Sequence, residues 1–149
     1  MPGGEQAVRE PWRMAAAHLL DSGCDLRPLE VSVPSESLRS IQKMLDRKSH
    51  SPLTSSMGRL FDAVAALAGI RSRVSFEGQA AVELEWLATD TSFAGTYDWD
   101  LLECGASPEA SDSPFWTIDT RPLIRAVHAD RDQQVAAREI ARRFQSAVV

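Results

Sequence analysis

The stretch SPLTSSMGRLFDAVAALAG, residues 51–69, constrains the fold more than any other part of the sequence. It joins a polar turn that contains proline and glycine directly to a strongly apolar run. The spacing of the apolar residues predicts a helix from Gly58 to Ala68 with one buried face. The residues expected on that face are Leu60, Phe61, Val64, Leu67 and Ala68. A second junction of this kind, FEGQAAVELE at residues 76–85, predicts a helix over 77–88.

Polar residues and glycines gather at the starts of these two helices. Asp62 lies in the first turns of its helix, where the positive end of the helix dipole favours a carboxylate. Serines can cap a helix, and glycines permit close approach of the backbone to a ligand. We take six residues as candidates for ligand binding: Ser55, Ser56, Gly58, Asp62, Glu77 and Gly78. On its own, this pattern favours two capped helices packed together over a ligand site.

The pattern along the rest of the chain predicts a mainly helical α+β domain of about six helices and one β-hairpin. We expect a helix over residues 5–21, started or kinked by Pro11, and a second helix over 35–48. Short strands are expected at 96–102 and 115–118, joined by a polar tip at 103–114. All 149 residues then form a single domain.

Two further helices are expected after the hairpin. Thr120 and Pro122 predict the start of a short helix, because threonine caps helices and proline is tolerated in their first turn. Asp132 is the expected cap of the last helix, whose inward residues are Ala136, Ile140, Phe144 and Val148. The basic residues of that helix, Arg138, Arg142 and Arg143, are interpreted as a solvated face.

The charge and the apolar content of the sequence exclude several classes of function. A net charge of −5 and a pI near 5.2 do not favour a nucleic-acid or anionic-membrane surface. No apolar run approaches the roughly 20 residues that span a bilayer, so we expect no membrane partner. Cys24 and Cys104 are eighty positions apart, and we expect two free thiols in a cytoplasmic protein.

The sequence offers little support for a self-contained enzyme. His18, His50 and His128 are scattered, with no second histidine or cysteine at ligand spacing, so no local metal site is expected. No GxSxG motif, cysteine with a nearby histidine or GxxxxGK phosphate loop occurs. Glu83 and Glu85 are too close along a helix to share a face, which argues against a paired-carboxylate mechanism.

The same motifs resemble the HypF carbamoyltransferases of nickel-iron hydrogenase maturation. PLTSSMGRLFDAVAAL, residues 52–67, is similar to the signature of that family almost residue for residue. FEGQAAVELE resembles its SYEGxAAxxLE segment, with Phe76 in place of the tyrosine. PGG at residues 2–4 and EPWRMA at residues 10–15 resemble the family in the same order.

The resemblance implies a fold and a site. It covers the middle of the C-terminal HypF domain, which is similar to the tRNA threonylcarbamoyl transferases, so we expect part of an actin-like or sugar-kinase ATPase fold. In those relatives the corresponding helix reads GEAFDK, and its aspartate binds the nucleotide ribose. By this resemblance Asp62 is the expected ribose ligand, and Gly78 the expected glycine beside the nucleotide.

The resemblance also implies a reaction, a cofactor and a partner. We expect carbamoyl-adenylate, derived from ATP, as the ligand, and HypE as the acceptor of the carbamoyl group. The family's HHHAH metal motif and SGGV turn do not occur in these residues, and Gln145 stands where a histidine is frequent. The sequence is therefore interpreted as a fragment or reduced relative that is inactive alone. A non-catalytic interaction module or homodimer, and an ordinary helical domain that shares only ancestry with HypF, stay open as alternatives.

Overall fold

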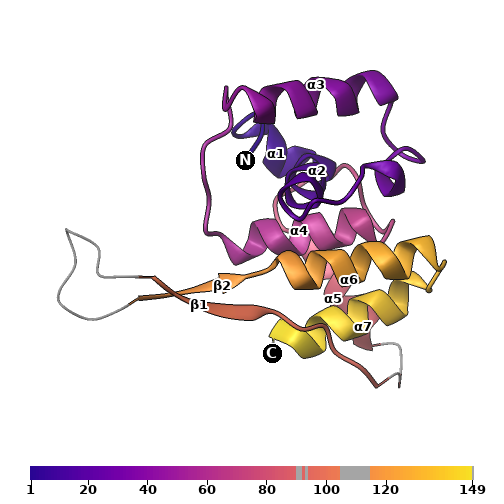
Figure 1. Cartoon of the computed structure of the whole chain (residues 1–149). Helices are drawn as coiled ribbons and strands as arrows, with labels where there is room; N and C mark the ends of the chain where they lie inside the picture. Colours follow the sequence, from indigo (N-terminus) through magenta and orange to yellow (C-terminus); the bar gives the residue numbers. More distant parts are fainter. Residues whose placement is uncertain (90–91, 93, 105–114, 149) are drawn as a thin grey trace.

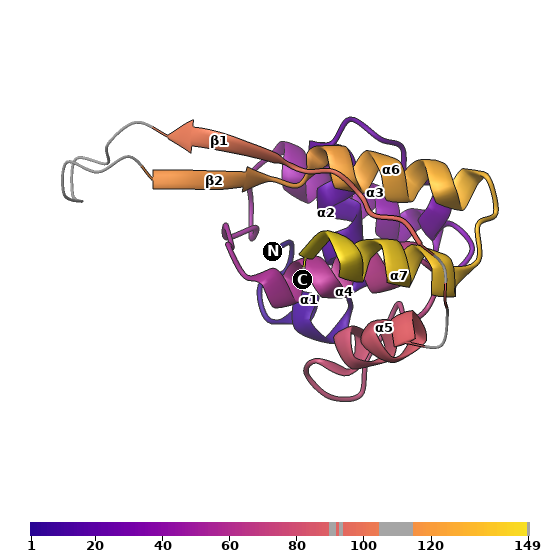
Figure 2. The ribbon, with the colours of Figure 1, turned by 90° about the horizontal axis from the view of Figure 1, so that it is seen from below.

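Helix α4 lies at the centre of the molecule, between two groups of helices. The computed structural model describes residues 1–89, 92, 94–104 and 115–148. On one side of α4 (Met57–Leu67) are α1 (Gln6–Arg9), α2 (Trp12–Asp21), the 3-10 turn η1 (Arg27–Leu29) and α3 (Ser35–Asp46). On the other side are α5 (Gln79–Thr89), α6 (Arg121–Asp132) and α7 (Ala137–Val148), as Figures 1 and 2 show. This arrangement confirms the mainly helical α+β class.

Most side chains of α4 are buried, including those on the face that the sequence predicts. Leu60, Val64, Leu67 and Ala68 are at most 4% exposed. Phe61 is half-buried rather than enclosed, and its ring meets that of Phe144 edge-on, with 4.8 Å between the centroids. The burial of α4 against α2, α5, α6 and α7 supplies the apolar contact that stabilises the domain.

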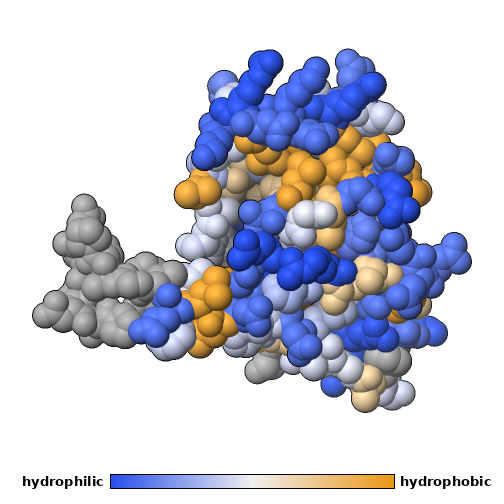
Figure 3. All heavy atoms as spheres, viewed as in Figure 1, coloured by the Kyte–Doolittle hydropathy of each residue, from blue (hydrophilic) through white to orange (hydrophobic). Residues whose placement is uncertain are grey.

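The predicted helix over 5–21 is two helices, α1 and α2. Pro11 lacks an N–H and disfavours the helical conformation of the residue before it, and Glu10 has φ −126° and ψ 74°. Among the described residues this break makes seven α-helices instead of about six. Helix α3 is amphipathic: Leu38 and Ile41 are buried beneath it. Figure 3 shows its outer face as hydrophilic, with hydrophobic residues gathered below.

Helices α2, α3, α4 and α6 end in the same backbone motif. At the end of α4, the Ile70 N–H donates to the Ala65 carbonyl at 2.9 Å, and the Gly69 N–H donates to Ala66 at 3.1 Å. This pair of bonds is the Schellman motif, which requires a left-handed residue just after the helix. The four left-handed residues are Gly23, Lys48, Gly69 and Gln134, with φ of 73°, 50°, 77° and 59°. Two of these helix ends therefore use a residue with a side chain where glycine is favoured.

The strands form a two-stranded antiparallel ribbon that projects from the helices (Figures 1 and 2). Strand β1 (Asp100–Cys104) pairs with β2 (Phe115–Asp119), with Leu101 opposite Ile118. The predicted strand over 96–102 thus begins four residues too early. Most of the predicted tip, residues 105–114, lies outside the described part of the chain.

Side-chain contacts explain why the first strand starts late. The Tyr97 hydroxyl donates to Asp130 Oδ2 at 2.5 Å, and the Trp99 indole N–H donates to the Ala147 carbonyl at 2.9 Å. These bonds hold residues 97–99 against α6 and α7, and pairing with β2 begins only at Asp100. Arg143 Nη1 lies 2.6 Å from the same Asp130 oxygen, so Arg143 is not on a solvated face as predicted.

The starts of α6 and α7 differ in detail from the predicted helix caps. Thr120 occupies the N-cap position of α6 as predicted, but its side chain makes no cap bond; Asp119 Oδ1 instead accepts from the Arg121 N–H at 3.0 Å. Asp132 ends α6 instead of starting α7, so α6 is not the short helix that was expected. Ala136 is exposed, while Ile140 and Phe144 are buried as predicted. None of the helices in the described residues is long and apolar enough to cross a membrane.

Replacing Gln134 by glycine is expected to stabilise the protein. A left-handed residue with a Cβ is strained, and glycine removes that strain at the cost of greater freedom in the unfolded chain. Gln134→Gly should raise the free energy of unfolding by about 0.5–1 kcal/mol in urea titrations. The matched control is Gln133→Gly, because Gln133 has φ −81° and should only lose stability. An equal loss in both variants would contradict the expectation.

The alkaline limit of stability is expected to depend on Tyr97, the only tyrosine of the chain. Burial, and then the bond to Asp130, raise the pKa of the Tyr97 hydroxyl above its usual 10.0. The folded state therefore favours the protonated phenol, so its stabilisation is complete below pH 10 and declines as the pH rises further. Urea unfolding from about pH 8 to 11 should show this decline in the wild type but not in Tyr97→Phe. If the free energies of unfolding of the wild type and Tyr97→Phe differ by the same amount at every pH, the expectation is refuted.

Candidate functional site

The candidate site is formed where α4 and α5 begin, and the structure places all six predicted residues there. Ser55, Ser56 and Gly58 are exposed around the first turn of α4. Ser56 occupies the N-cap position, but its side chain makes no cap bond. Instead the Ser56 N–H donates to Thr54 Oγ1 at 3.2 Å. The serine hydroxyls are thus not used as helix caps, contrary to the sequence prediction.

A guanidinium lies between the two predicted carboxylates. Arg59 Nη1 is 2.9 Å from Asp62 Oδ2, and Arg59 Nη2 donates to Glu77 Oε1 at 3.3 Å. The first pair is close but is not aligned for a hydrogen bond, so it is mainly electrostatic. Arg59 thereby links α4 to the segment that opens α5. Opposite charges at positions i and i+3 were the sequence signal for Arg59, which the prediction missed.

The two carboxylates differ sharply in their surroundings. Asp62 is 2% exposed and Arg59 is 7% exposed, whereas the side chain of Glu77 is 75% exposed. Burial raises the pKa of the Asp62 carboxyl, the Arg59 guanidinium opposes that rise, and Glu77 adds to it. Asp62 is thus a buried carboxylate paired with Arg59, and Glu77 is the accessible member of the group.

Gly78 has the backbone conformation that its prediction implies. Its φ of +82° lies in the left-handed region that favours glycine, one residue before α5 begins. A Cβ at this position would meet no atom within 4 Å, so the space beside Gly78 is open. The backbone here is therefore accessible to a ligand.

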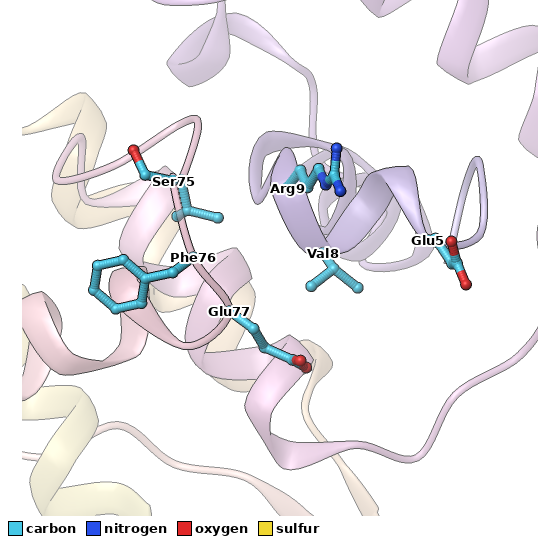
Figure 4. A pocket seen from close by; sticks show the side chains of 7 residues that line it. Glu5, Val8, Arg9, Ser75, Phe76 and Glu77 are labelled. Atoms are coloured by element: carbon cyan, nitrogen blue, oxygen red, sulfur yellow. The ribbon is translucent and has the colours of Figure 1, made fainter.

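A shallow hollow of about 400 Å³ adjoins the exposed carboxylate. It lies between α1 and the segment before α5, and Glu5, Val8, Arg9, Ser75, Phe76 and Glu77 line it. In Figure 4 the side chains of Arg9 and Phe76 point away from each other, so the hollow is not an enclosed pocket. Within the described residues, no three histidine, cysteine or acidic side chains are grouped so as to hold a metal ion.

Removing one member of the buried ion pair is expected to lower the free energy of unfolding more than removing both members. Asp62→Leu removes the buried partner of Arg59 and leaves the buried guanidinium only the exposed Glu77, so the free energy of unfolding should fall by about 3 kcal/mol. The double variant Arg59→Met/Asp62→Leu should recover most of this loss, because no uncompensated charge remains. Urea titration of the single and double variants measures the coupling. Additive losses would show that the two side chains do not interact.

Comparisons with known proteins agree with this fold. All of residues 1–149 match the family described as "Carbamoyltransferase, Kae1-like Domain, second subdomain". The carbamoyltransferase HypF of Rhizobium leguminosarum is 44% identical over 126 residues, covering 83% of this chain and 15% of the relative. That of Rhodobacter capsulatus is 37% identical over 148 residues, covering 86% of this chain and 20% of the relative.

A solved structure has the same architecture. The crystal structure of full-length HypF in the phosphate- and nucleotide-bound form superposes with a TM-score of 0.78 at 33% identity. The match covers 99% of this chain and 22% of that one. The curated relatives are likewise much longer, since this chain spans between 10% and 24% of their lengths. Its sequence and fold show that the chain belongs to the HypF carbamoyltransferase family and corresponds to the second subdomain of the Kae1-like domain.

Proposed function

We propose that this chain supplies the nucleotide side of a carbamoyl-adenylate site in a HypF-type carbamoyltransferase. In the reaction that we propose, the carbamoyl group leaves the adenylate and is transferred to the C-terminal cysteine thiol of HypE in hydrogenase maturation. The observation that carries the proposal is the placement of two carboxylates and a left-handed glycine at the starts of α4 and α5. The related structure is described as nucleotide-bound, which supports a nucleotide as the ligand.

The residues at this site suit the sugar and backbone contacts of a nucleotide more than the chemical step. A carboxylate accepts hydrogen bonds from both hydroxyls of a ribose, and the open backbone at Gly78 allows close approach. The ribose role that resemblance assigns to Asp62 requires the groups around this carboxylate to move, because Asp62 is 2% exposed. No proton-transfer or nucleophilic role is assigned to these residues, and the isolated chain is expected to transfer no carbamoyl group.

An interaction module is the second candidate, and one observation favours it. Four apolar side chains of the ribbon are exposed: Leu101, Leu102, Trp116 and Ile118. Two strands alone are marginally stable in water, so such a ribbon is suited to packing against another surface. The partner in this case is the remainder of a HypF-like protein or a second copy of the chain.

Calorimetric titration with a non-hydrolysable carbamoyl-adenylate analogue tests the leading proposal. The wild-type chain should bind the analogue, and the double variant Asp62→Asn/Glu77→Ala should lose at least tenfold in affinity, as expected for lost hydrogen bonds to charged groups, about 1.5–3 kcal/mol each. Glu83→Ala is the control, because Glu83 lies on α5 and pairs with Arg71, away from the site. Equal binding of the analogue by the wild type and the double variant, or no binding by either, would defeat the nucleotide assignment. Carbamoyl transfer to HypE by the isolated chain would overturn the claim that it is inactive alone.

A further inference from the structure

We propose that the β-ribbon is a docking site for another protein, which supplies an extended segment of alternating apolar and basic residues as a third strand along β1. The partner is a separate protein of opposite charge, rather than the remainder of a HypF-like protein or a second copy of this chain. No residue of β1 or β2 belongs to the candidate nucleotide site, so the docking site is independent of that proposal.

The ribbon has open edges and little support from the helices. Within the described residues its sheet contains only β1 and β2, and the two strands pack mainly against each other. Figures 1 and 2 show the ribbon extending away from the helices. An unpaired strand edge presents a row of backbone N–H and C=O groups, with which another extended segment can pair. A two-stranded ribbon alone is marginally stable in water, so a third strand would stabilise it.

One face of the ribbon exposes apolar side chains. The register places Leu101 opposite Ile118, and Trp116 lies on the same face because side chains two residues apart in a strand point the same way. Leu101, Ile118 and Trp116 are 51%, 47% and 54% exposed. Figure 3 shows hydrophobic surface on the ribbon where it joins the helices. Apolar side chains of an added strand would extend this face and shield it from water.

The charge of the ribbon selects the partner. No lysine, arginine or histidine occurs in residues 96–119. Asp98, Asp100 and Glu103 are exposed, and no ion pair within the described part of the chain includes them. A second copy docked here would bring like charges together, which disfavours a homodimer through this edge. Basic side chains on the added strand would instead meet the three carboxylates.

The two faces of β1 explain the alternating pattern of the partner segment. Leu101 and Asp100 lie on opposite faces, because successive side chains of a strand alternate. A neighbouring strand that alternates apolar and basic residues therefore matches both faces. Glu103, on the Leu101 face towards the outer end of β1, offers a further contact to a basic side chain. Obligate interfaces are mostly apolar, whereas charged groups beside apolar ones steer proteins that associate from solution, so the combination at β1 indicates a separate protein.

Fluorescence anisotropy with short labelled peptides tests the proposal. The probe is a peptide of about seven residues, a length typical of a strand, in which valine and lysine alternate. The chain should bind this peptide. It should bind at least about tenfold more weakly to a peptide with glutamate in place of each lysine, and to one whose backbone nitrogens are methylated. The first change removes the charge match, and the second removes the donors for strand pairing.

Substitutions in the chain locate the binding site of the valine–lysine peptide. Trp116→Ser should weaken binding at least about tenfold, as expected for a tryptophan at the centre of an interface. The matched control is Trp86→Ser, because Trp86 is 75% exposed on α5 and should not contribute. Glu103→Gln should weaken binding about threefold and reduce its salt dependence, as expected for an exposed ion pair. Glu85→Gln, at an exposed position of α5, should change neither.

Other results would overturn the docking site or its occupant. Equal binding of the lysine and glutamate peptides would exclude charge matching, and undiminished binding of the methylated peptide would exclude strand pairing. Equal effects of Trp116→Ser and Trp86→Ser would place the binding elsewhere. Self-association of the chain that Trp116→Ser abolishes would make a second copy the occupant. In a longer HypF-type protein that contains this chain, protection of Trp116 from hydroxyl-radical labelling before any peptide is added would show that the rest of that protein covers the face.

Discussion

The enclosure of α4 is the constraint on which the rest of the structure depends. Four helices pack against it, and its sequence fills the interior with small and branched apolar side chains between Leu60 and Leu67. The same enclosure takes Arg59 and Asp62 into the interior. A buried charge is tolerated when it is paired, so these two side chains meet at 2.9 Å. The apolar packing thus creates the electrostatic arrangement at the candidate site.

The sequence predicted best the elements whose signals are local and periodic. Helices α3 and α4 begin and end within two residues of the predicted ranges, because their apolar spacing is regular. The errors occurred where distant residues compete for the chain. Tyr97 bonds to Asp130, and Trp99 bonds to Ala147, so the strand starts four residues later than its β-forming residues suggest. No local pattern contains such information.

The candidate site shows the same division between local and distant effects. The left-handed backbone at Gly78 could be predicted, because a glycine before an apolar helix is a local signal. The difference between Asp62 and Glu77 could not. Both are acidic residues near the start of a helix, yet one is enclosed and the other is at the surface. That difference arises from how α4 and α5 pack. Arg59 was missed although it has a local signal, the opposite charge of Asp62 three residues along the helix.

The shape of the site fits a chain that forms one wall of a binding cleft. Pockets for nucleotide-sized ligands bury most of the ligand surface, whereas the hollow beside Glu77 is shallow and its side chains do not converge. The carboxylates, however, are already positioned by Arg59 without a ligand. A preorganised polar wall lowers the cost of binding once opposing surfaces are added. In the role that we propose, this wall orients the sugar of a nucleotide, and the phosphate contacts and the transfer chemistry lie elsewhere in a longer HypF-type protein.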